Sequence, residues 1–173
     1  MSTNGIQPQN PDVQESPVKD LTMGRMLGDI VWLLSQSAAH KHFALADLEW
    51  LVMPPLALNQ YRILRDDEKP VTVALWAYLN AETEQRLEAG AMRLMPQEWA
   101  QGMRVDPERG MVAGEGGNLW LIEIVAPFHT PENQLADFCL NDLMKSVFAG
   151  KRFKMFQVDP QTQQRKVVEM TGL

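Results

Sequence analysis

The sequence predicts a single α/β domain with a mixed central sheet and helices on both of its faces. Three observations support this. Residues 119–125 form an almost entirely apolar run between glycines and a proline, which is typical of a strand covered on both faces. A helical pattern and another strand follow, and this order predicts parallel pairing. Upstream, two strand-like segments flank a charged turn and predict an antiparallel hairpin.

The amino-terminal part is expected to be disordered up to about residue 19. Residues 1–19 are rich in Asn, Gln, Pro and Ser, so burial would gain too little free energy to offset the lost chain entropy. Asp20 or Thr22 can cap a helix that runs to about Ser37 with apolar residues at helical spacing. We therefore assign residues 20–173 to one domain.

The middle of the chain is predicted to hold short helices and the hairpin. A helix over 44–52 is expected to stop at Pro54, because proline lacks the amide that continues a helix. Residues 61–65 and 71–76 are the hairpin strands. A charged helix follows over 81–89.

The segment between this helix and the apolar run is irregular in sequence. Gly90 is expected to end the charged helix, and Pro96 can begin another short one. Residues 103–117 are rich in glycine, so we expect a mobile excursion with a small turn of its own.

The carboxyl-terminal part completes the sheet. A helix is predicted over about 132–148 and ends before Gly150. Strands are predicted over 153–158 and 165–170, joined by a turn.

Composition excludes several classes of protein. The 173 residues contain no apolar run of about 18 residues and no basic region followed by an apolar stretch. We therefore expect neither a membrane span nor a secretory signal. The expected location is the cytoplasm. Cys139 is the only cysteine, which excludes an internal disulfide and a multi-cysteine metal site. We expect it to be a small buried side chain.

The charge is uneven along the chain. The net charge of -6 argues against nucleic-acid binding, which needs clustered lysines and arginines. From Lys145 onward, the carboxyl-terminal part nevertheless carries six basic and two acidic residues. The basic ones are Lys145, Lys151, Arg152, Lys154, Arg165 and Lys166. They indicate either an anionic partner or a solvated face.

His40 is the first candidate for chemistry. An unperturbed histidine has a pKa of about 6.5 and can exchange protons near neutral pH, and the chain has only three. His42 and His129 lack the neighbours of a metal site, so we predict no metal. Ser37 precedes His40 by three residues and is either a helix-terminal polar residue or a neighbour of the imidazole.

Glu123 is the one ionisable residue in the apolar run. An unpaired buried carboxylate is unfavourable, so Glu123 reaches solvent at a strand edge or has a partner. The functional alternative pairs it with His40, where a carboxylate would orient the imidazole and stabilise its protonated form.

Several short motifs resemble, in the same order, those of the toxin-activating lysine acyltransferases of RTX haemolysins and leukotoxins. The resemblance covers roughly residues 23 to 172. The motifs are Ser37-Ala38-Ala39-His40, Pro55, Asn59-Gln60-Tyr61, Pro70-Val71, Trp76-Ala77, Glu98-Trp99, Ile122-Glu123, Ala126-Pro127-Phe128, Phe153 and Val158-Asp159-Pro160.

The resemblance implies a fold similar to that of the Gcn5-related N-acetyltransferases. It also implies a cytoplasmic enzyme that moves a fatty acyl group from acyl-carrier protein to internal lysines of an RTX protoxin. The donor is then the phosphopantetheine thioester of the carrier protein, with no permanently bound cofactor. A homodimer is implied by the family alone.

By matching position, the resemblance makes His40 the catalytic histidine and Glu123 its carboxylate, where the family typically has aspartate. Ser37, Asn59, Lys145 and Arg152 are the expected substrate-binding residues. The junction 126–131 lacks the glycines of a pyrophosphate loop, which favours a carrier-protein donor over free coenzyme A. Residues 103–116 are an apparent insertion that could cover or reshape the acyl site.

A second hypothesis is a non-catalytic protein with the same fold that binds a lipidated or amphipathic partner. The glutamate at position 123 and the insertion favour it.

Overall fold

The computed structural model describes residues 18–91, 93–159, 161–162 and 164–173. The disorder expected for residues 1–19 therefore falls almost wholly outside the described residues. Helix α1 (Val18–Gln36) begins ahead of the predicted domain start. Asp20 and Thr22 lie within α1, so the prediction that one of them caps it was wrong. Residues 18–22 contain neither glycine nor proline that would interrupt a helix.

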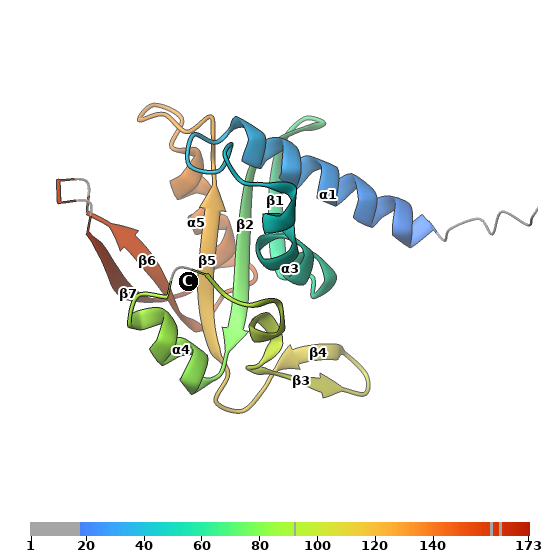
Figure 1. Ribbon diagram of the computed structural model, residues 1–173, viewed down its shortest axis with the longest axis vertical. Helices are drawn as coiled ribbons and strands as arrows, with labels where there is room; N and C mark the ends of the chain where they lie inside the picture. Colours follow the sequence, from blue (N-terminus) through green and yellow to red (C-terminus); the bar gives the residue numbers. More distant parts are fainter. Residues whose placement is uncertain (1–17, 92, 160, 163) are drawn as a thin grey trace, which may run out of the picture.

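Five strands of the described chain form one mixed sheet in the order β1-β2-β5-β6-β7 (Figure 1). Neighbouring strands are antiparallel except β5 and β6, which pair in parallel as predicted. The strands are β1 (Tyr61–Asp66), β2 (Lys69–Leu79), β5 (Asn118–Val125), β6 (Arg152–Val158) and β7 (Arg165–Thr171).

Helices cover both faces of this sheet, as the sequence predicts (Figure 1). On one face, Ile30 and Leu33 of α1 pack with buried residues of β2 and of the short helices that follow α1. On the other face, Cys139 and Leu143 of α5 (Leu135–Lys145) pack against Trp76 and the apolar residues of β5 and β6. The two cores are separated by the sheet, so each strand residue belongs to one or the other.

The predicted helix over 44–52 is instead three short ones. They are the 3-10 turn η1 (Leu45–Asp47), α2 (Leu48–Leu51) and α3 (Met53–Ala57). Pro54 and Pro55 do not end the helical region but lie in the first turn of α3. Proline is tolerated there because first-turn amides have no intrahelical acceptor to bond.

The next two helices agree with the sequence. Helix α4 (Ala81–Glu88) is capped by Asn80, whose Oδ1 accepts a hydrogen bond of 2.8 Å from the Thr83 amide. Gly90 follows α4 with a φ of 105°, a left-handed conformation that suits glycine. The 3-10 helix η2 spans Pro96–Ala100.

The glycine-rich excursion predicted over 103–117 is an ordered hairpin. Strands β3 (Met103–Asp106) and β4 (Gly110–Ala113) pair antiparallel in a sheet of their own. Close backbone contacts explain some of the glycines: a Cβ on Gly117 would lie 2.1 Å from the Gly102 carbonyl oxygen. The high glycine content of this segment therefore reflects closely packed backbone.

Helix α5 is shorter than the predicted 132–148. Thr130 and Asn133 bond each other's amides through their side chains, and Gln134 has a φ of 47°, so the helix begins only at Leu135. Within the described residues, no helix is both long and apolar enough to cross a membrane.

Candidate active site

The parallel strands β5 and β6 pair over only part of their length. Their register runs from Leu119 opposite Phe153 to Leu121 opposite Met155. Beyond this point the strands separate, and a cavity of about 450 Å³ lies between them. Ile122, Glu123 and Ile124 of β5 line it together with Phe156 and Val158 of β6.

The cavity wall is mostly apolar. The side chains lining it from the helices and loops are Phe43, Trp50, Leu51, Leu87, Leu94, Trp99, Ala136 and Leu140. The ionisable groups in the wall are His40, Arg93, Glu123, Asp137 and Arg165. An apolar cavity with a few polar groups suits a small-molecule or acyl ligand.

His40 lies in a turn just after α1. The His40 amide donates to the Ser37 carbonyl at 3.1 Å, and the Lys41 amide donates to the same oxygen at 2.9 Å. This turn brings the Ser37 hydroxyl 2.8 Å from Nδ1 of His40. The imidazole and the Phe43 ring meet in an edge-to-face arrangement with centroids 5.2 Å apart. His40 is 9% exposed, so it is held at the cavity wall by contacts on several sides.

Glu123 lies beside His40 at the cavity wall. Its Oε2 lies 3.7 Å from Nε2 of His40, and its side chain is 36% exposed. The carboxylate therefore reaches solvent although β5 is a central strand, and it also lies beside the imidazole. The distance is that of an ion pair and longer than a hydrogen bond.

A bulge in β5 turns Glu123 to this face. The register with β2 pairs Leu75 with Glu123 but Trp76 with Leu121, so Ile122 is an extra residue. Leu121 packs in the core beside α5, whereas Ile122 packs in the core beside α1. Strict alternation would send Glu123 to the α5 side. The bulge resets the alternation and directs the carboxylate toward His40.

The contacts of His40 allow two states of the imidazole. If Nδ1 carries the proton, it donates to the Ser37 hydroxyl, and the lone pair of Nε2 faces the cavity and Glu123. If the hydroxyl donates instead, Nε2 carries the proton and cannot accept one. Only the first state makes His40 a base toward the cavity.

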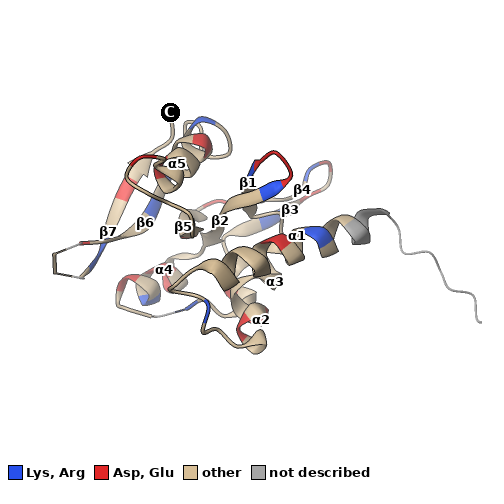
Figure 2. Ribbon diagram, turned by 90° about the horizontal axis from the view of Figure 1, so that it is seen from above, with Lys and Arg blue, Asp and Glu red and all other residues tan. Residues whose placement is uncertain are grey.

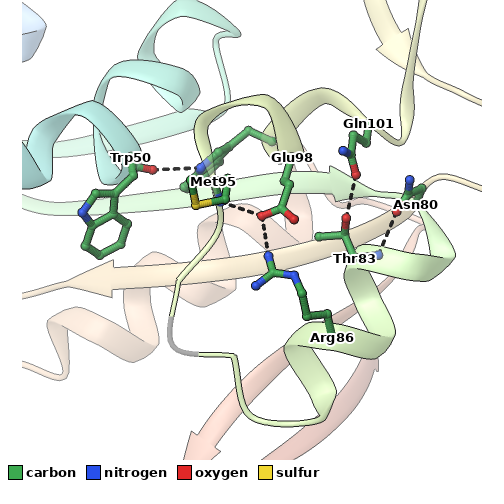
Figure 3. A network of polar contacts seen from close by, with 8 residues as sticks. Trp50, Asn80, Thr83, Arg86, Met95, Glu98 and Gln101 are labelled. Carbon is green, nitrogen blue, oxygen red and sulfur yellow. Dashed lines mark hydrogen bonds and ion pairs between the residues drawn. The ribbon is translucent and has the colours of Figure 1, made fainter.

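A polar network holds the helical wall of the cavity in place (Figure 3). The indole nitrogen of Trp99 donates 2.9 Å to the carbonyl oxygen of Trp50. Glu98 accepts 2.6 Å from the Met95 amide and pairs with Arg86 of α4. A second link runs from Asn80 through Thr83 to Gln101. These bonds join α4 to η2 and η2 to α2, three elements that contribute residues to the cavity.

The other predicted substrate-binding residues lie away from His40. Asn59 is an exposed residue with a φ of 54° in the turn between α3 and β1. Lys145 is exposed at the end of α5. Arg152 is at the start of β6, 3.8 Å from Glu169, in a second hollow of about 360 Å³. None of the three lines the cavity that holds His40.

The basic residues of the carboxyl-terminal part do not form one cluster. Lysines and arginines are spread over several elements (Figure 2). Lys154 forms ion pairs with Glu84 at 3.1 Å and Glu88 at 2.8 Å, so α4 neutralises it. The hydrogen bond to Glu88 is the main reason that the pKa of Lys154 is raised. Arg165 alone of this group lines the cavity.

The structure also shows where the single cysteine lies and whether the described residues could hold a metal ion. Cys139 is fully buried on α5, as expected, and burial raises the pKa of its thiol to about 12. The thiol is therefore protonated at neutral pH and is a poor nucleophile. Across the described ranges, no group of three or more His, Cys, Asp or Glu side chains is arranged to hold a metal ion.

Sequence reasoning missed much of the cavity wall. Phe43, Trp50 and Arg93 lie in short or irregular segments without a recognisable motif. A partial signal existed for Trp99, because Glu98-Trp99 is one of the motifs that carry the resemblance. Arg165 was noted only as part of a charge run.

The model of the HlyC family, described as the RTX toxin acyltransferase family, matches residues 19–105 and 110–171. The chain belongs to this family. Membership agrees with the resemblance seen in the motifs and with a mixed α/β sheet covered by helices on both faces.

Individual relatives carry names of the same kind. The RTX-I toxin-activating lysine-acyltransferase ApxIC of Actinobacillus pleuropneumoniae is 28% identical over 85% of this chain and 74% of its own length. The protein-lysine myristoyltransferase HlyC of Escherichia coli is 28% identical over 85% of this chain and 75% of its own. The leukotoxin-activating lysine-acyltransferase LktC of Mannheimia haemolytica is 34% identical over 60% of this chain and 53% of its own length. All three are named as acyltransferases.

The match to the family also corrects the predicted insertion. Only residues 106–109 fall between the two matched ranges, at the turn of the β3–β4 hairpin. This hairpin lies on the far side of β2 from β6 and β7 (Figure 1) and contributes no residue to the cavity. Residues 103–116 therefore do not line the cavity that holds His40.

Proposed function

We propose that this protein transfers a fatty acyl group from acyl-carrier protein to the ε-amino group of lysines in an RTX-type protoxin, with His40 as general base. The observation that carries the proposal is the position of His40 at the wall of an apolar cavity, with Ser37 on one nitrogen and Glu123 facing the other. Membership of the family and the names of the relatives supply the class of reaction.

The chemistry requires a base. A lysine amine has a pKa of about 10.4 and is mostly protonated at neutral pH, so it first releases one proton to solvent. The neutral amine then attacks the thioester carbon, the carbon–nitrogen bond forms and the carbon–sulfur bond breaks. The second proton of the attacking nitrogen passes to Nε2 of His40, which gives it to the departing sulfur, so that the leaving group is a thiol.

Ser37 and Glu123 serve this step in different ways. A hydrogen bond from Nδ1 to the Ser37 hydroxyl keeps the Nε2 lone pair toward the cavity. When Nε2 takes the proton, the imidazolium lies 3.7 Å from the Glu123 carboxylate, and their attraction stabilises the charged state. Neither residue exchanges a proton with the substrate.

The same proposal names the donor and the partners. The thioester arm of acyl-carrier protein is the acyl donor, bound for one turnover and not kept as a cofactor. The RTX protoxin is the acceptor. The apolar side chains of the cavity wall, which include Phe43 and Leu140, form the surface that receives the acyl chain. A cytoplasmic location and a homodimer belong to this proposal as expectations from the family.

The test is acylation of a candidate protoxin in the presence of acyl-carrier protein loaded with a fatty acyl group, followed by mass spectrometry of the protoxin lysines. Wild-type protein should add the mass of one acyl group per target lysine. His40→Ala should reduce the rate about 10²- to 10⁴-fold, the usual contribution of a general base. His42→Ala, at an exposed neighbouring position, is the matched control.

Two outcomes would contradict the proposal. Near-normal transfer by a folded His40→Ala protein would show that His40 is not the general base. Binding of the protoxin with no mass gain on any lysine, by wild-type protein, would favour the non-catalytic alternative.

A further inference from the structure

Two arginines line the cavity without a carboxylate partner among the described residues. Arg93 lies in the segment between α4 and η2, and Arg165 is the first residue of β7. The cavity contains two carboxylates, Glu123 and Asp137, yet neither forms an ion pair with these arginines. Most other arginines of the described residues have a carboxylate partner: Arg62, for example, is bonded to Asp142 through two nitrogens.

Aromatic rings of the cavity wall hold both guanidinium groups. Arg165 lies 3.9 Å from the centroid of the Phe156 ring, and Arg93 lies 5.6 Å from that of Trp50. Both rings are fixed in turn. The indole nitrogen of Trp50 donates 3.1 Å to Asp47, and the Phe156 ring packs against Trp120. Stacking on a ring positions a guanidinium while leaving its N–H groups free for another partner.

The first turn of α5 disfavours an anion, because Asp137 lines the cavity there. An anionic group that enters the cavity is therefore repelled by this carboxylate and attracted by Arg93 and Arg165. This arrangement differs from the common one, in which a helix amino terminus with free amides receives the phosphate.

We infer that Arg93 and Arg165 form a binding site for the phosphate of the acyl donor's thioester arm. The inference deepens the proposed function and rests on it. A phosphodiester is the charged group of a phosphopantetheine arm, and guanidinium groups match its geometry with paired hydrogen bonds. Phosphate held by the arginines would leave the thioester end of the arm to reach His40.

The experiment compares three donors that carry the same acyl group. Acyl-carrier protein has both phosphate and protein, acyl-phosphopantetheine has phosphate alone, and acyl-pantetheine has neither. Transfer to the protoxin is measured for wild-type protein, Arg93→Gln, Arg165→Gln and the control Arg104→Gln. Arg104 is exposed on β3, outside the cavity.

The site predicts a specific pattern. Each cavity variant should raise KM for acyl-phosphopantetheine about tenfold, as expected for loss of a hydrogen bond to a charged group, with little change in kcat. The same variants should leave transfer from acyl-pantetheine unchanged, and Arg165→Lys should recover part of the loss. Arg104→Gln should match wild type with every donor.

Three results would overturn the inference. An effect with acyl-carrier protein but not with acyl-phosphopantetheine would mean that the arginines bind carboxylates of the carrier protein. An equal effect with acyl-pantetheine would mean a general role in cavity shape. Equal KM values for variants and wild type would show that the two arginines do not bind the phosphate.

Failure of the proposed function gives a different result. In that case wild-type protein transfers acyl groups from none of the donors. Calorimetric titration with phosphopantetheine then still tests the site: binding that each arginine variant weakens about tenfold supports it, and binding that is absent or unaffected overturns it.

Discussion

The hydroxyl oxygen of Ser37 lies 2.8 Å from Nδ1 of His40, on the side of the imidazole that faces away from Glu123. The residue that contacts Nδ1 is thus a near neighbour in sequence, three positions earlier. The residue that faces its other nitrogen comes from the central strand. The two contacts act on different states of the imidazole and can be tested separately.

Replacing Ser37 by alanine should lower kcat about tenfold with little change in KM, because Nδ1–H loses its acceptor and the Nε2-protonated tautomer becomes more populated. Nitrogen NMR of labelled histidine measures the two tautomers directly. Ser35→Ala is the control, since the Ser35 hydroxyl bonds the Trp32 carbonyl and not His40. An unchanged tautomer ratio in Ser37→Ala would contradict the assigned role.

The value of kcat should depend more on the charge of the Glu123 side chain than on its length. Glu123→Gln removes the attraction to the imidazolium and should reduce kcat about 10- to 100-fold, or roughly 1.4 to 2.7 kcal/mol of transition-state stabilisation. Glu123→Asp keeps the charge and should stay within a few-fold of wild type. Steady-state acylation kinetics measure both, with exposed Glu115→Gln as the control. Equal activity of the Gln and Asp variants would show that charge is irrelevant.

Trp99→Phe should destabilise the fold by about 1 to 3 kcal/mol, because the carbonyl of Trp50 loses its donor inside the helical wall. Urea unfolding measures the change. Trp32→Phe is the matched control at a position that is 36% exposed, and should change stability by about 0.5 kcal/mol or less. Equal losses in the two variants would mean that the Trp99 bond contributes little.

The thiol of Cys139 should make stability fall in alkaline solution. Burial raises its pKa to about 12 in the folded protein, from an ordinary value of 9.0. Between these values the folded state keeps the proton and the unfolded state releases it. The free energy of unfolding from this group is therefore constant below about pH 9 and decreases above it, by at most about 1.4 kcal/mol per pH unit.

The comparison of wild type with Cys139→Ala isolates this effect. Denaturant unfolding between pH 8 and pH 10.5 should show a steeper fall in wild-type protein. The native thiol should also resist iodoacetamide at pH 8 and react once the protein is unfolded. Rapid alkylation of the folded protein would contradict the burial of this residue.

The parts of the fold that the sequence predicts well depend on local pattern. The apolar run of β5, the hairpin of β1 and β2 and the helix before β6 each carry a periodicity or a turn signal. Their order then implies the parallel pair. Helix ends were less well placed, because prolines that stop a helix in one position begin it in another, as Pro54 does.

The site was harder to predict for two physical reasons. The direction of Glu123 depends on the bulge at Ile122, which no spacing rule reveals because it arises from pairing with β2. The availability of the carboxyl-terminal basic residues could not be predicted either, because Lys154 is neutralised by glutamates of α4, which are distant in sequence. Charge runs describe composition, whereas a binding site depends on which charges the fold leaves unpaired.

The separation of β5 from β6 after Leu121 has a consequence for hydrogen exchange. From Glu123 to Val125, β5 pairs with β2 on one side and has no register with β6 on the other. Amides that point to the open side exchange with water through the cavity without unfolding of the sheet. We therefore expect their exchange rates to follow occupancy of the cavity, and binding of the proposed acyl donor should slow deuterium uptake in this half-strand even when no turnover takes place.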